Sequence, residues 1–348
     1  MDAPKKSLRL RLKRAALFFT SVFVTLLVVE IALRLFIPSY NFTIPWSYEY
    51  DEELGYRLKP AAHLFHTTDF QQETRTNRAG TENFQEGFDD YPQLVLAVGD
   101  SYTQGVGVPA DASYPFQLDL FLNRDAEGYY VKRFGVVNLG VSGFGGEESL
   151  LTLRRHAALL RRPPRFILYL CCDNDMADDL LFLRGVRKRK FTKGDPYWGR
   201  LATPARWLTD HSQIGLKAKR LMSERARARA VKEAAAQTSP DGREISAAEF
   251  ESSILERLSA YAKGQGATLV VSWSDANRSY YWLKYWAARN GVAFADWAPR
   301  AASVQAAMPA LPLDNTHSGG HHRAWTNRVI AEEFARQMGA SETMKSER

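Results

Sequence analysis

The serine best placed for chemistry is Ser101, which directly follows a short apolar run. Residues 94–98 read Leu-Val-Leu-Ala-Val, and the run stops at Gly99-Asp100-Ser101. This pattern predicts a buried strand that ends in a polar turn. Ligands of open α/β sheets bind at the carboxyl ends of strands, because loops and helix N-termini converge there. Ser101 is therefore a candidate nucleophile, and Asp100 is interpreted as a residue that fixes the turn.

A serine hydroxyl attacks efficiently only when a neighbouring base takes its proton and an acid orients that base. The sequence Asp314-Asn315-Thr316-His317, in a loop before the last expected helix, supplies both groups. This spacing allows the Asp314 carboxylate to accept from one ring nitrogen of His317 while the other nitrogen faces the serine. The residues thus predict an acyl-transfer triad of Ser101, His317 and Asp314.

Acyl transfer also requires hydrogen-bond donors for the oxyanion that develops on the substrate. The backbone amides of Ser101 and Gly140 follow two expected strands, and Asn174 follows a third. We expect these two amides and the Asn174 side chain to form the oxyanion hole.

Alternating strand and helix patterns must position these residues. The expected strands are residues 94–98, 136–139, 166–171, 267–273 and 292–296, and the expected helices are 114–122, 147–161, 249–263, 279–290 and 323–338. Such alternation predicts a parallel sheet of about five strands with helices on both faces. At 348 residues the chain is long enough for one sizeable core with an additional segment.

The N-terminus predicts a membrane anchor. Six cations and one acid before residue 15 supply five of the seven net positive charges, so the charge of the remainder does not indicate nucleic-acid binding. Residues 15–37 are apolar except for Glu30 and Arg34, and this length can span a bilayer. The cations place residues 1–14 in the cytoplasm and the body of the protein outside it. A cleaved signal peptide is the alternative, but no Ala-x-Ala site follows the apolar run.

Three further segments fall outside the strand and helix alternation. Residues 38–92 are expected to form extended pieces that pack on the domain, and residues 339–348 form a polar tail. Residues 184–245 read as a basic, partly helical insertion within a domain of residues 93–338. This insertion is either a solvated helical surface or a binding surface for an anionic polymer or membrane headgroups.

Four sequence blocks resemble, in order and spacing, those of the SGNH, or GDSL-like, hydrolases. The blocks are Gly99-Asp100-Ser101-Tyr102 with Gln104-Gly105, Asn138-Leu139-Gly140, Asp173-Asn174-Asp175 and Asp314-Asn315-Thr316-His317. The resemblance implies a flavodoxin-like three-layer α/β/α fold. It also implies Ser101 as nucleophile, His317 as base, Asp314 as its partner, and Ser101, Gly140 and Asn174 as the oxyanion hole. The anchor and residues 54–60 resemble membrane-tethered bacterial members of this family.

Two positions depart from the family pattern. Cys172 stands where glycine is usual, two residues before the asparagine, and could crowd the oxyanion; Tyr102 replaces a frequent leucine. The adjacent Cys171 and Cys172 are interpreted as small strand residues rather than a disulfide. His321 is expected to begin the last helix, with His322 as its exposed neighbour.

The sequence therefore predicts a single-pass protein of the bacterial inner membrane with an extracytoplasmic serine esterase or O-acetyltransferase domain. Acetyl esters of an envelope or exported polysaccharide are the favoured substrates, and proteins of that export system are possible partners. A lipid esterase or thioesterase, and a non-catalytic glycan-binding or assembly protein, are the alternatives. No metal-ligand spacing or phosphate-binding loop is recognised in the sequence, and no cofactor or nucleic-acid partner is expected.

Overall fold

A computed structural model describes residues 3–39, 47–66, 71–183, 185, 211–235, 247–315 and 318–339. The chain divides into two compact units: residues 1–41 with 198–224, and residues 42–197 with 225–348. The first contains the N-terminal helix, and the second contains the sheet and every residue of the candidate site.

The second unit is built on a five-stranded parallel sheet with the order β6-β5-β7-β8-β9. Its strands are β5 (Gln93–Gly99), β6 (Phe134–Asn138), β7 (Phe166–Cys171), β8 (Thr268–Trp273) and β9 (Ala293–Phe294). Numbered from the first strand, this is the 2-1-3-4-5 order of flavodoxin-like folds. The predicted fold class is therefore confirmed, with all five strands near their expected positions.

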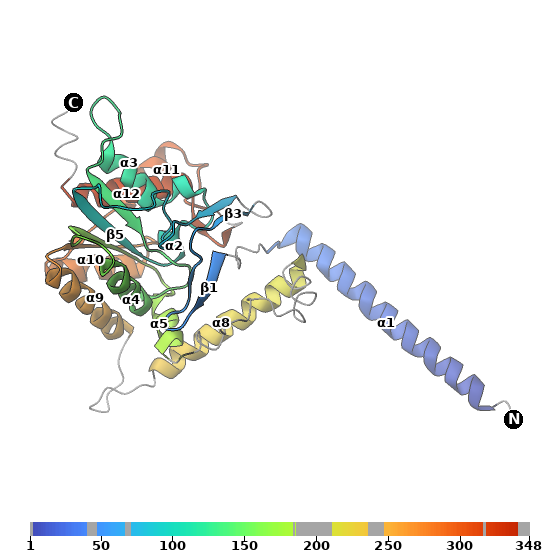
Figure 1. Cartoon of the computed structure of the whole chain (residues 1–348). Coiled ribbons are helices and arrows are strands. Elements are labelled where there is room, and N and C mark those ends of the chain that lie inside the picture. Colours follow the sequence, from blue (N-terminus) through green and yellow to red (C-terminus); the bar gives the residue numbers. More distant parts are fainter. Residues whose placement is uncertain are drawn as a thin grey trace. The chain divides into compact units, whose positions relative to one another are not determined.

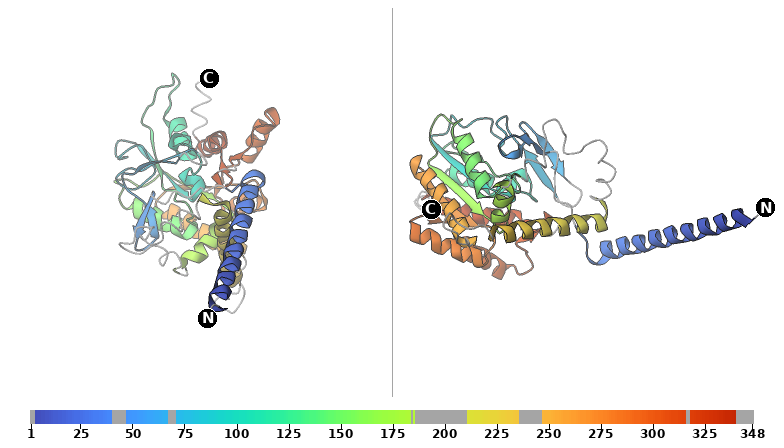
Figure 2. Two further views of the ribbon diagram at one scale, coloured as in Figure 1. Left: turned by 90° about the vertical axis from the view of Figure 1, so that its right-hand side faces the viewer. Right: turned by 90° about the horizontal axis from the view of Figure 1, so that it is seen from below.

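Helices cover both faces of this sheet (Figure 1). On one face lie α3 (Tyr114–Asn123) and α12 (Ala324–Gln337), and on the other α4 (Gly146–Ala157), α9 (Ala247–Gly264) and α10 (Arg278–Asn290). Figure 2 shows the same layers from two further directions. The α4 helix ends at Ala157, four residues before the predicted end, and Leu159 beyond it is 70% exposed. Among the described residues, three α-helices were not expected: α2 (Ser101–Gln104), α5 (Asp175–Leu183) and α11 (Ala298–Ala307).

The burial of the central strand β7 explains why its continuous apolar sequence predicted a strand. All six of its residues are buried, because strands flank it on both sides and helices cover both faces. A continuous apolar run is typical of such a strand, since neither face meets water. Its Leu168 is fully buried in the main core.

Two antiparallel hairpins precede the sheet. They pair β1 (Tyr48–Asp51) with β2 (Gly55–Leu58), and β3 (His63–His66) with β4 (Gln72–Arg75). Leu54, Tyr56 and Leu58 form a second apolar cluster with Val141 and Phe144, next to the Gly140 turn. The first hairpin therefore packs on the domain.

The outer edge of β6, the first strand in the order of the sheet, is paired by a side chain from the segment between β4 and β5. The side-chain Nδ2 of Asn83 donates to the backbone carbonyl of Val136 at 2.8 Å, and its Oδ1 accepts from the backbone amide of Asn138 at 2.9 Å. Asn83 thereby satisfies backbone groups that an edge strand would otherwise leave unpaired.

The first unit contains α1 (Ala3–Phe36), whose segment Leu10–Phe36 is 27 residues long and includes an 18-residue window with a mean hydropathy of 2.4. This helix is long and apolar enough to cross a membrane, a property that signal sequences share. Glu30 pairs with Arg34 as expected, at 2.9 Å. It also accepts from the amides of Gln213 and Ile214, at 2.8 and 3.1 Å, and so caps the start of α8 (Gln213–Ala235).

Candidate active site

Ser101 lies at the carboxyl end of β5, as the first residue of the short helix α2 (Ser101–Gln104). Asp100 fixes this turn, because its Oδ1 accepts from the Tyr102 amide at 2.9 Å. The turn also requires Gly99, whose φ is +148° and where a Cβ would lie 2.4 Å from Thr103 Oγ1. The expected role of Asp100 in the turn is confirmed.

A histidine contacts the Ser101 hydroxyl: His321 Nε2 lies 2.8 Å from Ser101 Oγ. The other ring nitrogen, Nδ1, contacts the carbonyl oxygen of Ser318. Since a carbonyl can only accept, Nδ1 carries the proton and Nε2 presents its lone pair to the serine. Burial lowers the pKa of His321, which keeps the ring neutral. His321 is thus in the tautomer that a general base needs.

A two-strand hairpin, β10 (Asp314–Asn315) with β11 (His321–His322), carries this histidine. The expectation that His321 begins the last helix is wrong, because α12 begins at Ala324. The expectation that His322 is exposed is also wrong: this residue is 3% exposed. Its Nδ1 lies 2.8 Å from Asp314 Oδ1 and its Nε2 lies 2.9 Å from the Ser274 carbonyl oxygen, so both nitrogens contact acceptors in the interior.

Two of the three predicted triad residues, Ser101 and Asp314, lie among the residues that the structure describes. His317 lies outside the described residues, so its role as base stays a prediction. Asp314 contacts His322 through its Oδ1. Among the described residues, the structure brings Ser101 together with His321, which the sequence reasoning had assigned to the helix start. The pair of histidines after Gly319-Gly320, in the same loop as His317, was the available signal.

The sheet register brings the three block regions together. Gly99 of β5 pairs with Leu170 of β7, which places Asp100 beside the end of β7. On the other side, the Val141 amide donates to the Gly99 carbonyl at 3.1 Å. The Gly140 turn therefore packs directly on α2, where a Cβ at Gly140 would lie 2.3 Å from the Gln104 amide nitrogen. Glycine is required here because the two backbones touch.

The three expected oxyanion donors differ in the hydrogen bonds that they already make within the protein. Ser101 begins α2, and amides in the first turn of a helix have no intrahelical acceptor. The Gly140 amide donates to Asn138 Oδ1 at 3.0 Å. The Asn174 amide nitrogen donates to Asp178 Oδ2 at 2.6 Å, which uses one of its two protons. Their joint role as an oxyanion hole stays a prediction.

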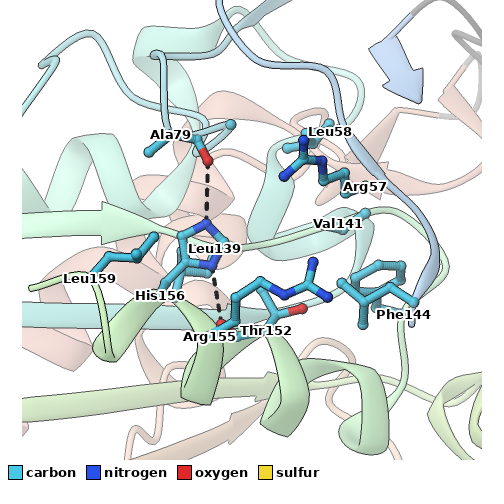
Figure 3. Close-up of a pocket in the computed structure, with 12 residues that line it drawn as sticks. Arg57, Leu58, Ala79, Leu139, Val141, Phe144, Thr152, Arg155, His156 and Leu159 are labelled. Carbon is cyan, nitrogen blue, oxygen red and sulfur yellow. Dashed lines mark hydrogen bonds between the residues drawn. The ribbon is translucent and has the colours of Figure 1, made fainter. Parts of the chain in front are cut away.

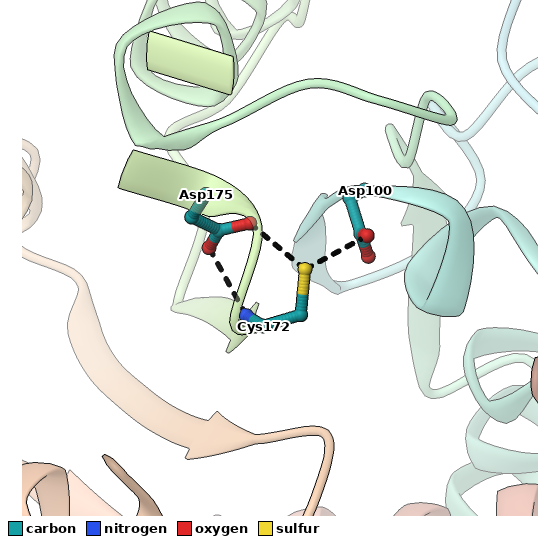
Figure 4. Close-up of side chains that lie close together, drawn as sticks. All are labelled: Asp100, Cys172 and Asp175. Atoms are coloured by element: carbon teal, nitrogen blue, oxygen red, sulfur yellow. Dashed lines mark hydrogen bonds between the residues drawn. The ribbon is translucent and has the colours of Figure 1, made fainter. Parts of the chain in front are cut away.

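Asp100, Cys172 and Asp175 form a buried cluster (Figure 4), and this cluster adjoins Ser101. Cys172 Sγ lies 2.9 Å from Asp100 Oδ2 and 3.0 Å from Asp175 Oδ1. Asp100 Oδ2 is also 3.0 Å from Ser101 Oγ. Burial raises the pKa of both carboxyl groups and of the thiol, which favours their protonated forms. Carboxyl and thiol groups can ligate metals, but here hydrogen bonds within the protein account for the arrangement.

A separate pocket of about 60 Å³ lies behind the Gly140 turn, between the first hairpin and α4 (Figure 3). Leu139 and Val141 line it, with Arg57, Arg155 and His156. Its cations are already paired: Arg57 with Glu49, and Arg155 with Asp51 and Glu53. Neither Ser101 nor His321 lines this pocket, so it is separate from the candidate active site.

The chain is similar to several solved structures. One is TesA, with 14% identity and a TM-score of 0.40, covering 71% of this chain and 98% of that one. A second is an acetyl xylan esterase from Geobacillus stearothermophilus, with 14% identity and a TM-score of 0.38, covering 72% and 95%. A third is a lipolytic protein of the G-D-S-L family from Desulfitobacterium hafniense, with 10% identity and a TM-score of 0.38, covering 70% and 99%.

No protein-family model and no curated protein matches the chain. Further similar structures are described as an acylhydrolase from Bacteroides fragilis and as GDSL-like lipases from Bacteroides thetaiotaomicron and Parabacteroides merdae. With TM-scores of 0.40 or below, these likenesses do not bear on the chemistry of this chain.

Proposed function

We propose that this protein is a serine esterase of the SGNH type, which cleaves acyl esters through a covalent intermediate on Ser101. The observation that carries this proposal is the 2.8 Å contact between Ser101 Oγ and the unprotonated Nε2 of His321. A neutral imidazole at hydrogen-bond distance from a serine hydroxyl can activate that hydroxyl for attack on a carbonyl. The four sequence blocks that resemble this family support the same chemistry.

The reaction has two halves. Ser101 Oγ attacks the ester carbonyl while His321 Nε2 takes the hydroxyl proton. Collapse of the tetrahedral intermediate breaks the bond to the alcohol, which leaves with the proton from His321. Water then attacks the acyl-enzyme, gives its proton to His321, and Ser101 recovers that proton as the carboxylic acid departs.

The Ser318 carbonyl has the orienting role that a carboxylate has in a triad. It accepts from Nδ1–H of His321, which fixes the tautomer. The same hydrogen bond keeps the imidazole ring turned toward the serine. Asp100, with Oδ2 3.0 Å from Ser101 Oγ, is a further polar group at the hydroxyl. The amides of Ser101 and Gly140 and the side chain of Asn174 are proposed to bind the oxyanion. The Gly140 amide must exchange its bond to Asn138 for one to the substrate.

The substrate is proposed to be an acetyl ester on an envelope or exported polysaccharide. The apolar helix α1 would anchor the protein in the bacterial inner membrane with the esterase domain on the extracytoplasmic side, because six cations precede its apolar residues 15–37. An O-acetyltransferase would use the same residues with a sugar hydroxyl in place of water.

Replacing Ser101 with alanine tests the proposal. The full chain in detergent should hydrolyse p-nitrophenyl acetate, and Ser101→Ala should reduce this rate to the uncatalysed background. Ser303→Ala, an exposed serine on α11, serves as the matched control and should keep the parent rate. Hydrolysis by the Ser101→Ala variant at the parent rate would contradict the proposal.

A further inference from the structure

We propose that Cys172 is a positioning residue that sets the orientation of the Asn174 carboxamide at the oxyanion. This inference rests on the proposed function and extends it to a residue outside the family pattern. In the sequence, Cys172 replaced a glycine and was expected to crowd the oxyanion. In the structure its sulfur contacts the side chain of Asn174.

Two contacts determine which way the carboxamide faces. Cys172 Sγ lies 3.0 Å from Asn174 Oδ1, and Asn174 Nδ2 donates to Asp178 Oδ2 at 2.6 Å. Rotating the amide by 180° would place its oxygen against the Asp178 carboxylate and its NH₂ group against a thiol that is itself a donor. The observed orientation satisfies both neighbours. It leaves one N–H of Asn174 for a substrate oxyanion.

The Cys172 thiol has one proton and three neighbouring oxygen atoms. The protonation of the two buried carboxyl groups therefore determines which oxygen accepts that proton. Asp100 Oδ2, Asp175 Oδ1 and Asn174 Oδ1 all lie within 3.0 Å of Cys172 Sγ. One S–H cannot donate to all three, so the remaining contacts are favourable only if the carboxyl groups carry protons that they donate to sulfur. Burial raises the pKa of both Asp100 and Asp175, which favours the protonated forms that these contacts require. The thiol is then free to donate to Asn174.

The position of Cys172 links two parts of the site. It directly follows β7, and β7 is paired with β5, which carries Ser101. One sulfur therefore touches the oxyanion donor Asn174 and the Asp100 carboxyl group that lies 3.0 Å from Ser101 Oγ. A glycine at this position would have no group to hold either side chain.

The neighbouring Cys171 is a matched control. It is also a free cysteine and is 1% exposed, but it belongs to the main apolar core. Replacing either thiol with alanine removes a buried sulfur of the same size. Only at Cys172 does the change remove a donor to Asn174.

The experiment compares Cys172→Ala, Cys172→Ser, Cys171→Ala and Asn174→Ala in p-nitrophenyl acetate hydrolysis. Removing a whole oxyanion donor lowers kcat by about 100-fold to 1,000-fold, so misorienting one should cost about 10-fold to 100-fold. We expect this loss in kcat for Cys172→Ala with KM unchanged, and a partial recovery in Cys172→Ser, because its hydroxyl can donate. Cys171→Ala should keep the parent kcat.

The double variant of Cys172→Ala and Asn174→Ala should be no slower than Asn174→Ala alone, because the thiol acts through that amide. A kcat for Cys172→Ala equal to the parent, or an equal loss in both cysteine variants, would overturn the proposal. So would fully additive losses in the double variant. These outcomes leave the serine chemistry standing as long as Ser101→Ala is inactive. Activity of Ser101→Ala at the parent rate would instead overturn the proposed function.

Discussion

Ionisation of the buried Glu251 on α9 lowers the free energy of unfolding at high pH, and replacing this residue with glutamine should remove the loss. The residue is 8% exposed, and burial raises its pKa from 4.5 to about 7. Between these two values the folded protein keeps a proton that the unfolded chain has released. The contribution of Glu251 to stability therefore falls as the pH rises from 4.5 to 7 and is constant above 7.

The magnitude follows from the size of the shift. A difference of one pKa unit corresponds to about 1.4 kcal/mol, so a rise from 4.5 to about 7 costs about 3 kcal/mol at pH 8.5. Glutamine keeps the shape of the protonated acid and has no proton to lose. Glu251→Gln should therefore be about 3 kcal/mol more stable than the parent at pH 8.5 and nearly equal to it at pH 5.

Chemical denaturation of both proteins in the same detergent, at pH 5 and pH 8.5, measures this difference. Glu256→Gln is the matched control, because this residue lies on the same helix and is exposed. The control should leave the pH dependence unchanged. Equal stability of Glu251→Gln and the parent at pH 8.5, or a loss of stability at both pH values, would refute the argument.

Three other predictions concern the site and the core. Because burial lowers the pKa of His321, kcat/KM for p-nitrophenyl acetate should rise with pH through a midpoint below 6.5, and a midpoint above 6.5 would contradict a buried base. Tyr56→Phe removes the 2.8 Å bond from the hairpin to the Ser142 carbonyl and should cost about 1 kcal/mol in denaturant unfolding; an unchanged midpoint would show that this bond contributes nothing. Leu168→Ala should cost about 2–5 kcal/mol in the same assay, because its side chain is fully buried in the central strand, and a smaller loss would mean that the core closes over the gap.

The sheet was predictable because its signals are local. The run that became β7 is apolar at every position, and the Gly99-Asp100-Ser101 turn combines a glycine with a side chain that caps α2. Each pattern depends on residues within a few positions of one another. The order of the strands had no such local signal, and it was expected only because the family resemblance implied a flavodoxin-like fold.

The helix α11 and the burial of the histidine pair were not predictable in the same way. Residues 298–307 are rich in alanine, with Ala301 as the buried residue, so they lack the repeated apolar spacing of a core helix. His322 is buried because Ser274, 48 residues away, accepts from its ring. His321 meets Ser101 across 220 residues. No periodicity in the sequence encodes contacts at such separations.

The most direct test of the account is the rate at which a fluorophosphonate labels Ser101 in the parent, in His321→Ala and in His317→Ala, with the labelled residue identified by mass spectrometry. Loss of a general base lowers a reaction rate by about 100-fold to 10,000-fold. If His321 activates Ser101, His321→Ala should lose labelling by this factor while His317→Ala keeps most of it. The reverse order would contradict the account and would assign the base to His317, as the Asp314-Asn315-Thr316-His317 spacing predicts.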